Sequence, residues 1–81
     1  MTPQQIRAAF VEELVRVAPD IDPASITDDD HLQSDLGLDS MDFLNLVSAL
    51  HHRLGVDVAE TDYPHLATAG AAVPYLLARL G

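Results

Sequence analysis

One serine stands where a helix is expected to begin, and its surroundings suit a phosphate ester. Residues 35–42 read DLGLDSMD. Asp39 is a good helix N-cap, so Ser40 should lie in the first turn with its hydroxyl outward, and Gly37 permits a left-handed backbone before it. A helix N-terminus presents free N–H groups and positive partial charge, and therefore tolerates a phosphate. Alone, a serine here is usually only a capping-region residue.

The same serine does not fit a catalytic nucleophile. A nucleophile elbow needs G-x-S-x-G on a strand-to-helix turn, but Gly37 lies three residues before Ser40 and Asp42 replaces the second glycine. His51 and His52 would lie roughly 15 Å or more along the same helix, at about 1.5 Å per residue. We therefore expect a protein that is not an enzyme.

The acidic segment before the serine does not fit a calcium loop. An EF-hand loop needs Gly at its sixth position and Glu at its twelfth. Counted from Asp28, those positions hold Gln33 and Asp39. The chain also has no Cys, which excludes disulfides and Cys-based metal sites. We expect no metal site.

The charge and length of the chain limit the classes of molecule that it can bind. The chain has 81 residues, a formal net charge of −9 and no Lys, which argues against binding to nucleic acid or anionic lipid. The acidity either favours partners with basic surfaces or serves only to keep a small protein soluble. So short a chain predicts one domain, residues 1–81, without a deep pocket. No apolar run approaches the roughly 20 residues of a membrane span, and no signal peptide is visible. We expect a cytoplasmic monomer.

Apolar residues recur at helical spacing in three segments, and none alternates long enough for a strand. The sequence therefore predicts an all-α fold: a small four-helix bundle of three main helices plus one short helix, with a long loop between helices one and two. The first helix is expected to begin at Thr2-Pro3 and to end before Pro19. The second should run from about Ser40 to Leu54. A short helical turn is expected at 63–66, and the last helix should run from after Thr68 to near Leu80.

Several details are open to test. Within the last helix, Pro74 has no N–H for a backbone hydrogen bond, and its ring would press on the carbonyl of Gly70. The sequence therefore predicts a kink in this helix, or a helix that starts nearer Ala72. Glu12 and Arg16 should form an ion pair on the solvent-exposed face of the first helix. The expected core consists of Ile6, Phe10, Leu14, Val17, Leu32, Leu36, Val47, Leu50, Leu54, Val73 and Leu76.

The run at 35–42 resembles the attachment motif of acyl carrier proteins, usually written D-L-G-x-D-S-L, and the order of elements is similar over nearly the whole chain. The resemblance implies that Ser40 receives 4′-phosphopantetheine from coenzyme A through a phosphopantetheinyl transferase that needs a divalent metal. The arm's thiol would hold acyl groups as thioesters for acyl-activating or acyl-transferring enzymes, which fits a chain without Cys. The protein would then be a carrier and not a catalyst.

The resemblance also assigns roles around the serine. Asp39 matches the aspartate that engages the transferase and its metal, and Met41 occupies the usual Leu position beside the arm. The partner-facing patch would consist of Asp35, Asp39, Met41, Asp42 and Leu44.

The sequence departs from the fatty-acid-synthesis pattern in three ways. The second helix ends His51-His52-Arg53 where acidic residues are typical, Ser48 replaces an apolar residue, and Phe43 is bulky enough to fill the space that shelters acyl chains. These departures favour a specialised fatty-acid or polyketide-type pathway. Aminoacyl or peptidyl carriers, which more often show Gly-Gly-x-Ser, and D-alanyl carriers, which the Asp-Ser-Met triplet resembles, stay as alternatives.

Overall fold

The computed structural model describes residues 1–80, and its regular structure there is entirely helical. The elements are α1 (Pro3–Val17), η1 (Pro23–Ser25), α2 (Ser40–Leu54), η2 (Glu60–Leu66) and α3 (Ala69–Leu80). The predicted all-α class and the three main helices are confirmed. The expected short turn at 63–66 belongs to η2, which begins at Glu60.

Local sequence signals set the helix ends. Thr2 and Gln5 form a reciprocal capping box, in which the Gln5 N–H donates to Thr2 Oγ1 at 3.1 Å and the Thr2 N–H donates to Gln5 Oε1 at 2.9 Å. At the end of α2, Gly55 adopts the left-handed conformation with φ 68°, which glycine reaches without a steric penalty. Both ends match their predicted positions.

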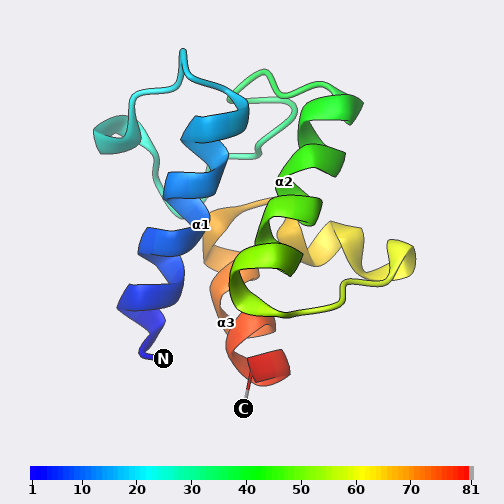
Figure 1. Ribbon diagram of the computed structural model, residues 1–81. Helices are drawn as coiled ribbons and strands as arrows, with labels where there is room; N and C mark the ends of the chain where they lie inside the picture. Colours follow the sequence, from blue (N-terminus) through cyan, green and yellow to red (C-terminus); the bar gives the residue numbers. More distant parts are fainter. Residues whose placement is uncertain (81) are drawn as a thin grey trace.

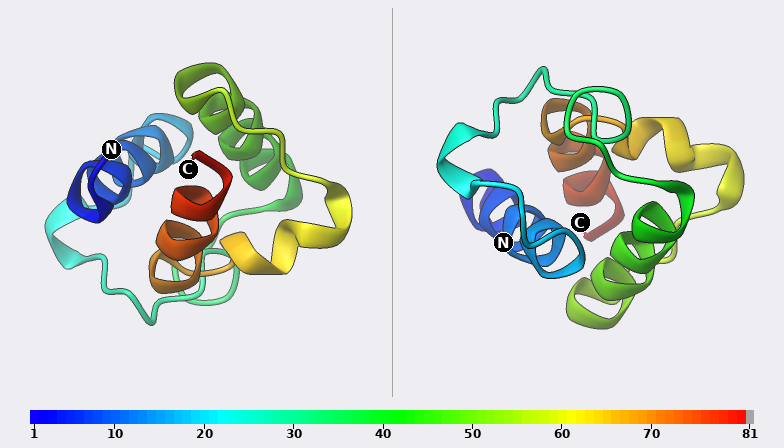
Figure 2. Two further views of the ribbon diagram at one scale, coloured as in Figure 1. Left: turned by 90° about the horizontal axis from the view of Figure 1, so that it is seen from below. Right: turned by 90° about the horizontal axis from the view of Figure 1, so that it is seen from above.

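The helices pack so that the long loop ends beside the start of α2. α2 runs back antiparallel to α1, and the loop crosses the end of the bundle between them (Figure 1). Seen along the bundle, α1, α2 and α3 surround a common centre, and η2 lies beside α3 on the side away from α1 (Figure 2). Ser40 therefore begins its helix at one end of the molecule.

The core draws on every element except η1. The predicted core is right at Ile6, Phe10, Leu14, Leu32, Val47, Leu50 and Leu76. It is wrong at four residues that are only partly buried: Val17, Leu36, Leu54 and Val73. Val17 and Leu54 are the last residues of their helices, and the other two lie at the edge of the core. Buried residues that the prediction left out include Ile26, Leu38, Phe43, Leu46, Val56, Leu66, Ala69 and Ala72.

Tertiary hydrogen bonds fix the long loop. Arg7 Nε donates to Asp28 Oδ1 at 2.9 Å, and Arg7 Nη2 donates to the Ile26 carbonyl at 3.2 Å. Further along, the Leu32 N–H donates to the Ala67 carbonyl at 2.9 Å. The first half of the loop is thus tied to α1 and the second half to the connection between η2 and α3, although the loop has little regular structure of its own.

Pro74 does not delay the start of α3, so the alternative of a helix beginning nearer Ala72 is wrong. The helix begins at Ala69, and Pro74 is its sixth residue. Contacts outside the helix hold its first turn: the Gly70 N–H donates to the Asp28 carbonyl at 3.1 Å, and the Ala71 N–H donates to Thr68 Oγ1 at 3.1 Å. These bonds satisfy amides that a helix start otherwise leaves without partners.

Gly70 is expected to resist substitution by alanine, although alanine favours a helix by about 1 kcal/mol. An added Cβ would lie 2.9 Å from the Asp28 carbonyl oxygen and 3.1 Å from Asp28 Cβ. We expect Gly70→Ala to destabilise the protein by about 1–2 kcal/mol, because the loop must move away. Thermal unfolding checks this, and a raised melting temperature would show that the loop yields freely.

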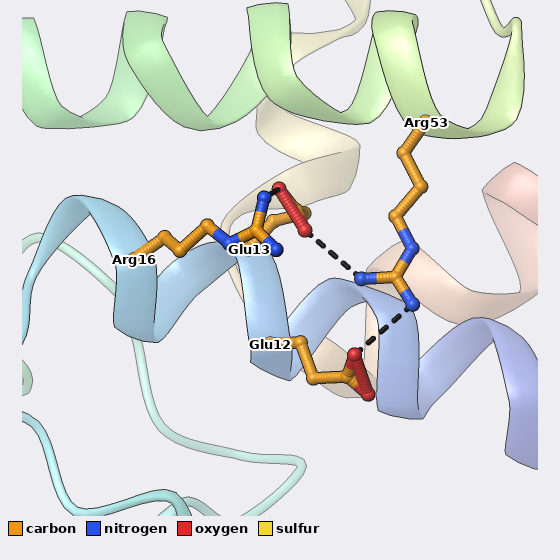
Figure 3. Close-up of polar contacts among 4 residues, drawn as sticks. All are labelled: Glu12, Glu13, Arg16 and Arg53. Atoms are coloured by element: carbon orange, nitrogen blue, oxygen red, sulfur yellow. Dashed lines mark hydrogen bonds and ion pairs between the residues drawn. The ribbon is translucent and has the colours of Figure 1, made fainter.

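A buried carboxylate links α1 to α2. Glu13 is only 4% exposed and accepts from Arg53 Nη1 at 2.9 Å and from Arg16 Nη1 at 3.4 Å. Arg53 also donates to Glu12 at 3.0 Å (Figure 3). The predicted Glu12–Arg16 pair is therefore wrong, because Arg53 from the neighbouring helix takes Glu12 and Arg16 turns to Glu13.

Candidate functional site

Ser40 is the first residue of α2, and it is exposed. The position follows from Asp39, whose extended backbone and side chain form the N-cap: Asp39 Oδ1 accepts from the Asp42 N–H at 2.8 Å. Other N–H groups of this first turn have no partner inside the helix, and the macrodipole adds positive partial charge. The serine oxygen thus lies in the most anion-tolerant part of the helix.

The two residues before the cap hold the serine outward. Gly37 adopts φ 79°, a left-handed conformation that other residues rarely adopt. Leu38 is then only 4% exposed, and its N–H donates to the Leu32 carbonyl at 3.0 Å. Sequence reasoning missed this anchor, although an apolar residue between Gly37 and the cap was the available signal.

Four of the predicted partner-facing residues lie at the start of α2. Met41 is 66% exposed and Leu44 is 46% exposed, so both present apolar area to solvent. Asp42 is partly buried, and its N–H is the one that Asp39 caps. Asp39, Met41, Asp42 and Leu44 therefore lie at the N-cap or in the first turns of α2.

Asp35 stands apart from the others because it shapes the loop. Its Oδ2 accepts from the His31 N–H at 2.8 Å, and the His31 Nδ1 lies 3.5 Å from the same oxygen. Asp35 is exposed as well. It can present charge to a partner while it closes the turn at residues 31–35.

A groove of about 530 Å³ opens beside Ser40. Ser40, Phe43 and Leu44 form its α2 side, and Glu60, Tyr63 and Pro64 of η2 form the opposite side. Loop residues 31–34 and Ala67 complete it. No local pattern predicted that Tyr63 would line this groove, because its contact with Phe43 of α2 depends on how η2 folds back.

The arginines lie away from the acidic residues at the serine. The arginine ion pairs among residues 1–80 join Arg7 to Asp28, Arg16 to Glu13, Arg53 to both Glu12 and Glu13, and Arg79 to Asp62. Within that part of the chain, no arginine pairs with Asp35, Asp39 or Asp42. The carboxylates of Asp39 and Asp42 at the start of α2 therefore present negative charge that attracts a basic surface.

In the described part of the chain, no histidine forms a hydrogen bond with Ser40. His51 Nδ1 lies 2.9 Å from Asp57 Oδ1, near the end of α2 opposite the serine. His31 lines the groove, and its Nδ1 lies 3.5 Å from Asp35 Oδ2. Among residues 1–80, no group of three or more His, Asp or Glu side chains could hold a metal ion.

Comparison with known proteins decides the family. Residues 4–76 match the family model described as "Phosphopantetheine attachment site". The chain is 31% identical over 78 residues to an acyl carrier protein of Phenylobacterium zucineum, covering 96% of this chain and 92% of that relative. The chain belongs to the acyl carrier protein family.

A second relative, a mitochondrial acyl carrier protein of Neurospora crassa, is 33% identical over 58 residues. That alignment covers 72% of this chain and 43% of the relative, so the chain spans less than half of that protein. The two acyl carrier proteins thus resemble this chain to a similar degree, although only the first does so over nearly its full length.

The prosthetic group of this acyl carrier protein is 4′-phosphopantetheine, and members of the family are non-catalytic carriers in general. The structure fits the group, since an exposed hydroxyl at a helix N-terminus borders a groove with apolar side chains. When bound, the group supplies a flexible arm with a thiol that forms thioesters.

None of the helices within residues 1–80 combines the length and the apolar character needed to cross a membrane.

Proposed function

We propose that Ser40 is the attachment residue of this acyl carrier protein, and that the chain holds acyl groups as thioesters for partner enzymes. The exposure of Ser40 at the start of α2, beside the groove, carries the proposal. The N–H groups of that turn stabilise an ester phosphate. Neighbouring carboxylates repel it, so a divalent metal or a basic partner surface is needed when the bond forms.

Two kinds of contact would recognise partners. Asp35, Asp39 and Asp42 attract basic side chains over a distance and orient the encounter. Met41 and Leu44 then lose exposed apolar area in the complex, which stabilises it. A phosphopantetheinyl transferase and acyl-activating or acyl-transferring enzymes are the partners that this surface suits.

We also propose a specialised fatty-acid or polyketide-type pathway in the cytoplasm, served by a monomer. In support, α2 ends in His51-His52-Arg53, and Arg53 is occupied by carboxylates of α1. A partner that reads acidic charge along the whole of α2 would find it only at the first turn. If a standard fatty-acid ketosynthase accepts this carrier as well as its own, the specialised role is wrong. A D-alanyl or aminoacyl carrier is the alternative on the same scaffold.

Modification in vitro tests the attachment. The purified protein is incubated with coenzyme A, magnesium and a broad-specificity phosphopantetheinyl transferase, and its mass is then measured. We expect the gain of one phosphopantetheine. No gain with several transferases would contradict the proposal and favour a plain helical interaction module.

Removing the charge of Asp39 while keeping its cap should slow that reaction. Asn is as good an N-cap as Asp, so Asp39→Asn should leave the melting temperature within a few degrees. We expect the kcat/KM of the transferase to fall by about tenfold or more, since a hydrogen bond to a charged group is worth about 1.5–3 kcal/mol.

Asp57→Asn serves as the control, because it removes one charge just beyond the opposite end of α2. It should leave the rate nearly unchanged. Equal effects of the two substitutions would show that the transferase senses only net charge. A large fall in melting temperature for Asp39→Asn would assign Asp39 a purely structural role.

A further inference from the structure

The groove beside Ser40 borders the hydrophobic core through Leu32 and Phe43, and the contact at Phe43 limits what the carrier can hold. We propose that the Phe43–Tyr63 ring pair closes the route from the groove into the core, so that this carrier keeps its acyl group at the surface and suits short acyl groups. The inference rests on the proposed attachment at Ser40.

The groove is short along α2. Within the described residues, its α2 side consists of Ser40, Phe43 and Leu44 and includes nothing later in the helix. Four residues of α-helix span about 6 Å. An extended chain that entered beside Ser40 would meet the Phe43 ring after one turn.

The ring pair fills the space at that point. The centroids of Phe43 and Tyr63 lie 5.5 Å apart with an interplanar angle of 65°, a favourable edge-to-face geometry. Phe43 is only 8% exposed, and the core residues Leu46, Leu50 and Leu66 have no exposed area. Because protein cores are close-packed, a longer chain could enter only by separating the rings and repacking these residues.

A polar cluster on α3 holds the Tyr63 side of this pair in place. The Tyr75 hydroxyl donates to Asp62 Oδ2 at 2.8 Å, and Arg79 Nη2 donates to the same oxygen at 2.7 Å. The hydrogen bonds from Tyr75 and Arg79 hold the pKa of Asp62 below its ordinary value. His65 stacks on Tyr75 with ring centroids 5.2 Å apart. η2 is therefore fixed to α3 on both sides of Pro64, and its wall of the groove is not free to swing outward.

Polar as well as apolar side chains line the groove. His31, Gln33, Ser34 and Glu60 supply polar atoms around the apolar floor. The part of an acyl chain that extends beyond the groove would stay in water and would gain no apolar burial from the carrier. A longer acyl chain would then neither slow the cleavage of its thioester nor raise the melting temperature of the carrier.

Thioester protection tests the inference. The protein is loaded from acetyl-, butyryl-, octanoyl- and dodecanoyl-coenzyme A by the transferase, and cleavage by hydroxylamine is followed by mass. For the natural sequence we expect rates within about twofold across the series and melting temperatures that do not rise with length, because no further apolar area is buried.

Two variants make the test decisive. Phe43→Val and Tyr63→Leu each remove one ring but keep an apolar side chain, so at least one should stay folded. We expect octanoyl to be cleaved about fivefold more slowly than acetyl on a folded variant, since the chain can now bury its methylenes. Strong protection of the octanoyl thioester on the natural sequence would overturn the proposal that the Phe43–Tyr63 pair closes the route into the core. So would the absence of protection on either folded variant. A protein that takes no arm at all contradicts the attachment at Ser40 instead.

Discussion

Replacing Ser40 with alanine is expected to abolish the attachment of phosphopantetheine and to leave the fold intact. The loss should be complete, because the ester needs the hydroxyl oxygen itself. Stability should hold, since Ser40 is exposed, Asp39 supplies the cap, and alanine is the best helix former. Mass after incubation with coenzyme A and transferase measures the first effect, and thermal unfolding measures the second.

Two other serines provide matched controls. Ser34 lines the same groove, and Ser48 is exposed two turns further along α2. Ser34→Ala and Ser48→Ala should each accept one arm at close to the natural rate. Modification that survives in Ser40→Ala and disappears in Ser34→Ala would move the attachment to the loop.

Replacing Arg53 with leucine is expected to produce the largest loss of stability among the arginine substitutions. Glu13 is 4% exposed, and Arg53 is its shorter contact at 2.9 Å (Figure 3). The hydrogen bonds from Arg53 to Glu13 and then to Glu12 raise the pKa of Arg53 above its ordinary value. Without Arg53, the buried carboxylate keeps only the 3.4 Å contact with Arg16, whose side chain is 77% exposed.

Leaving a buried charge poorly paired is costly, and we expect the melting temperature of Arg53→Leu to fall by roughly 10 °C or more. Glu13→Leu should cost much less, because Arg53 can still bond to Glu12 and reach water. The double variant should recover much of the loss. Equal losses of stability from the two single substitutions would contradict this account. They would show that attraction between the two charges stabilises the protein, and not that Arg53 offsets the cost of burying the Glu13 carboxylate.

Local signals in the sequence were sufficient for the helices and for the serine. Thr2, Asp39 and Gly55 are capping residues whose preference depends on neighbouring backbone, so they could be recognised without the tertiary structure. The outward hydroxyl of Ser40 follows from its place one residue after a cap. The same reasoning gave Leu14 and Leu50, which lie on the inward faces of their helices and have no exposed area.

Features that depend on how distant segments meet were not accessible. Arg53 reaches across 40 residues to Glu13, so the expected local pair of Glu12 with Arg16 was replaced by a tertiary one. The predicted start of α3 after Thr68 is correct, but the hydrogen bonds to the Asp28 carbonyl and to Thr68 Oγ1 that hold its first turn could not be predicted. Tyr63 likewise becomes part of the groove only because η2 folds onto α3.

Locating the arm on the protein made in cells tests the central claim most directly. Cleavage on the amino side of aspartate releases residues 39–41, in which Ser40 carries the only hydroxyl side chain. We predict that the mass of one phosphopantetheine travels with this tripeptide. An unmodified tripeptide from a protein whose arm appears on another fragment would contradict the assignment.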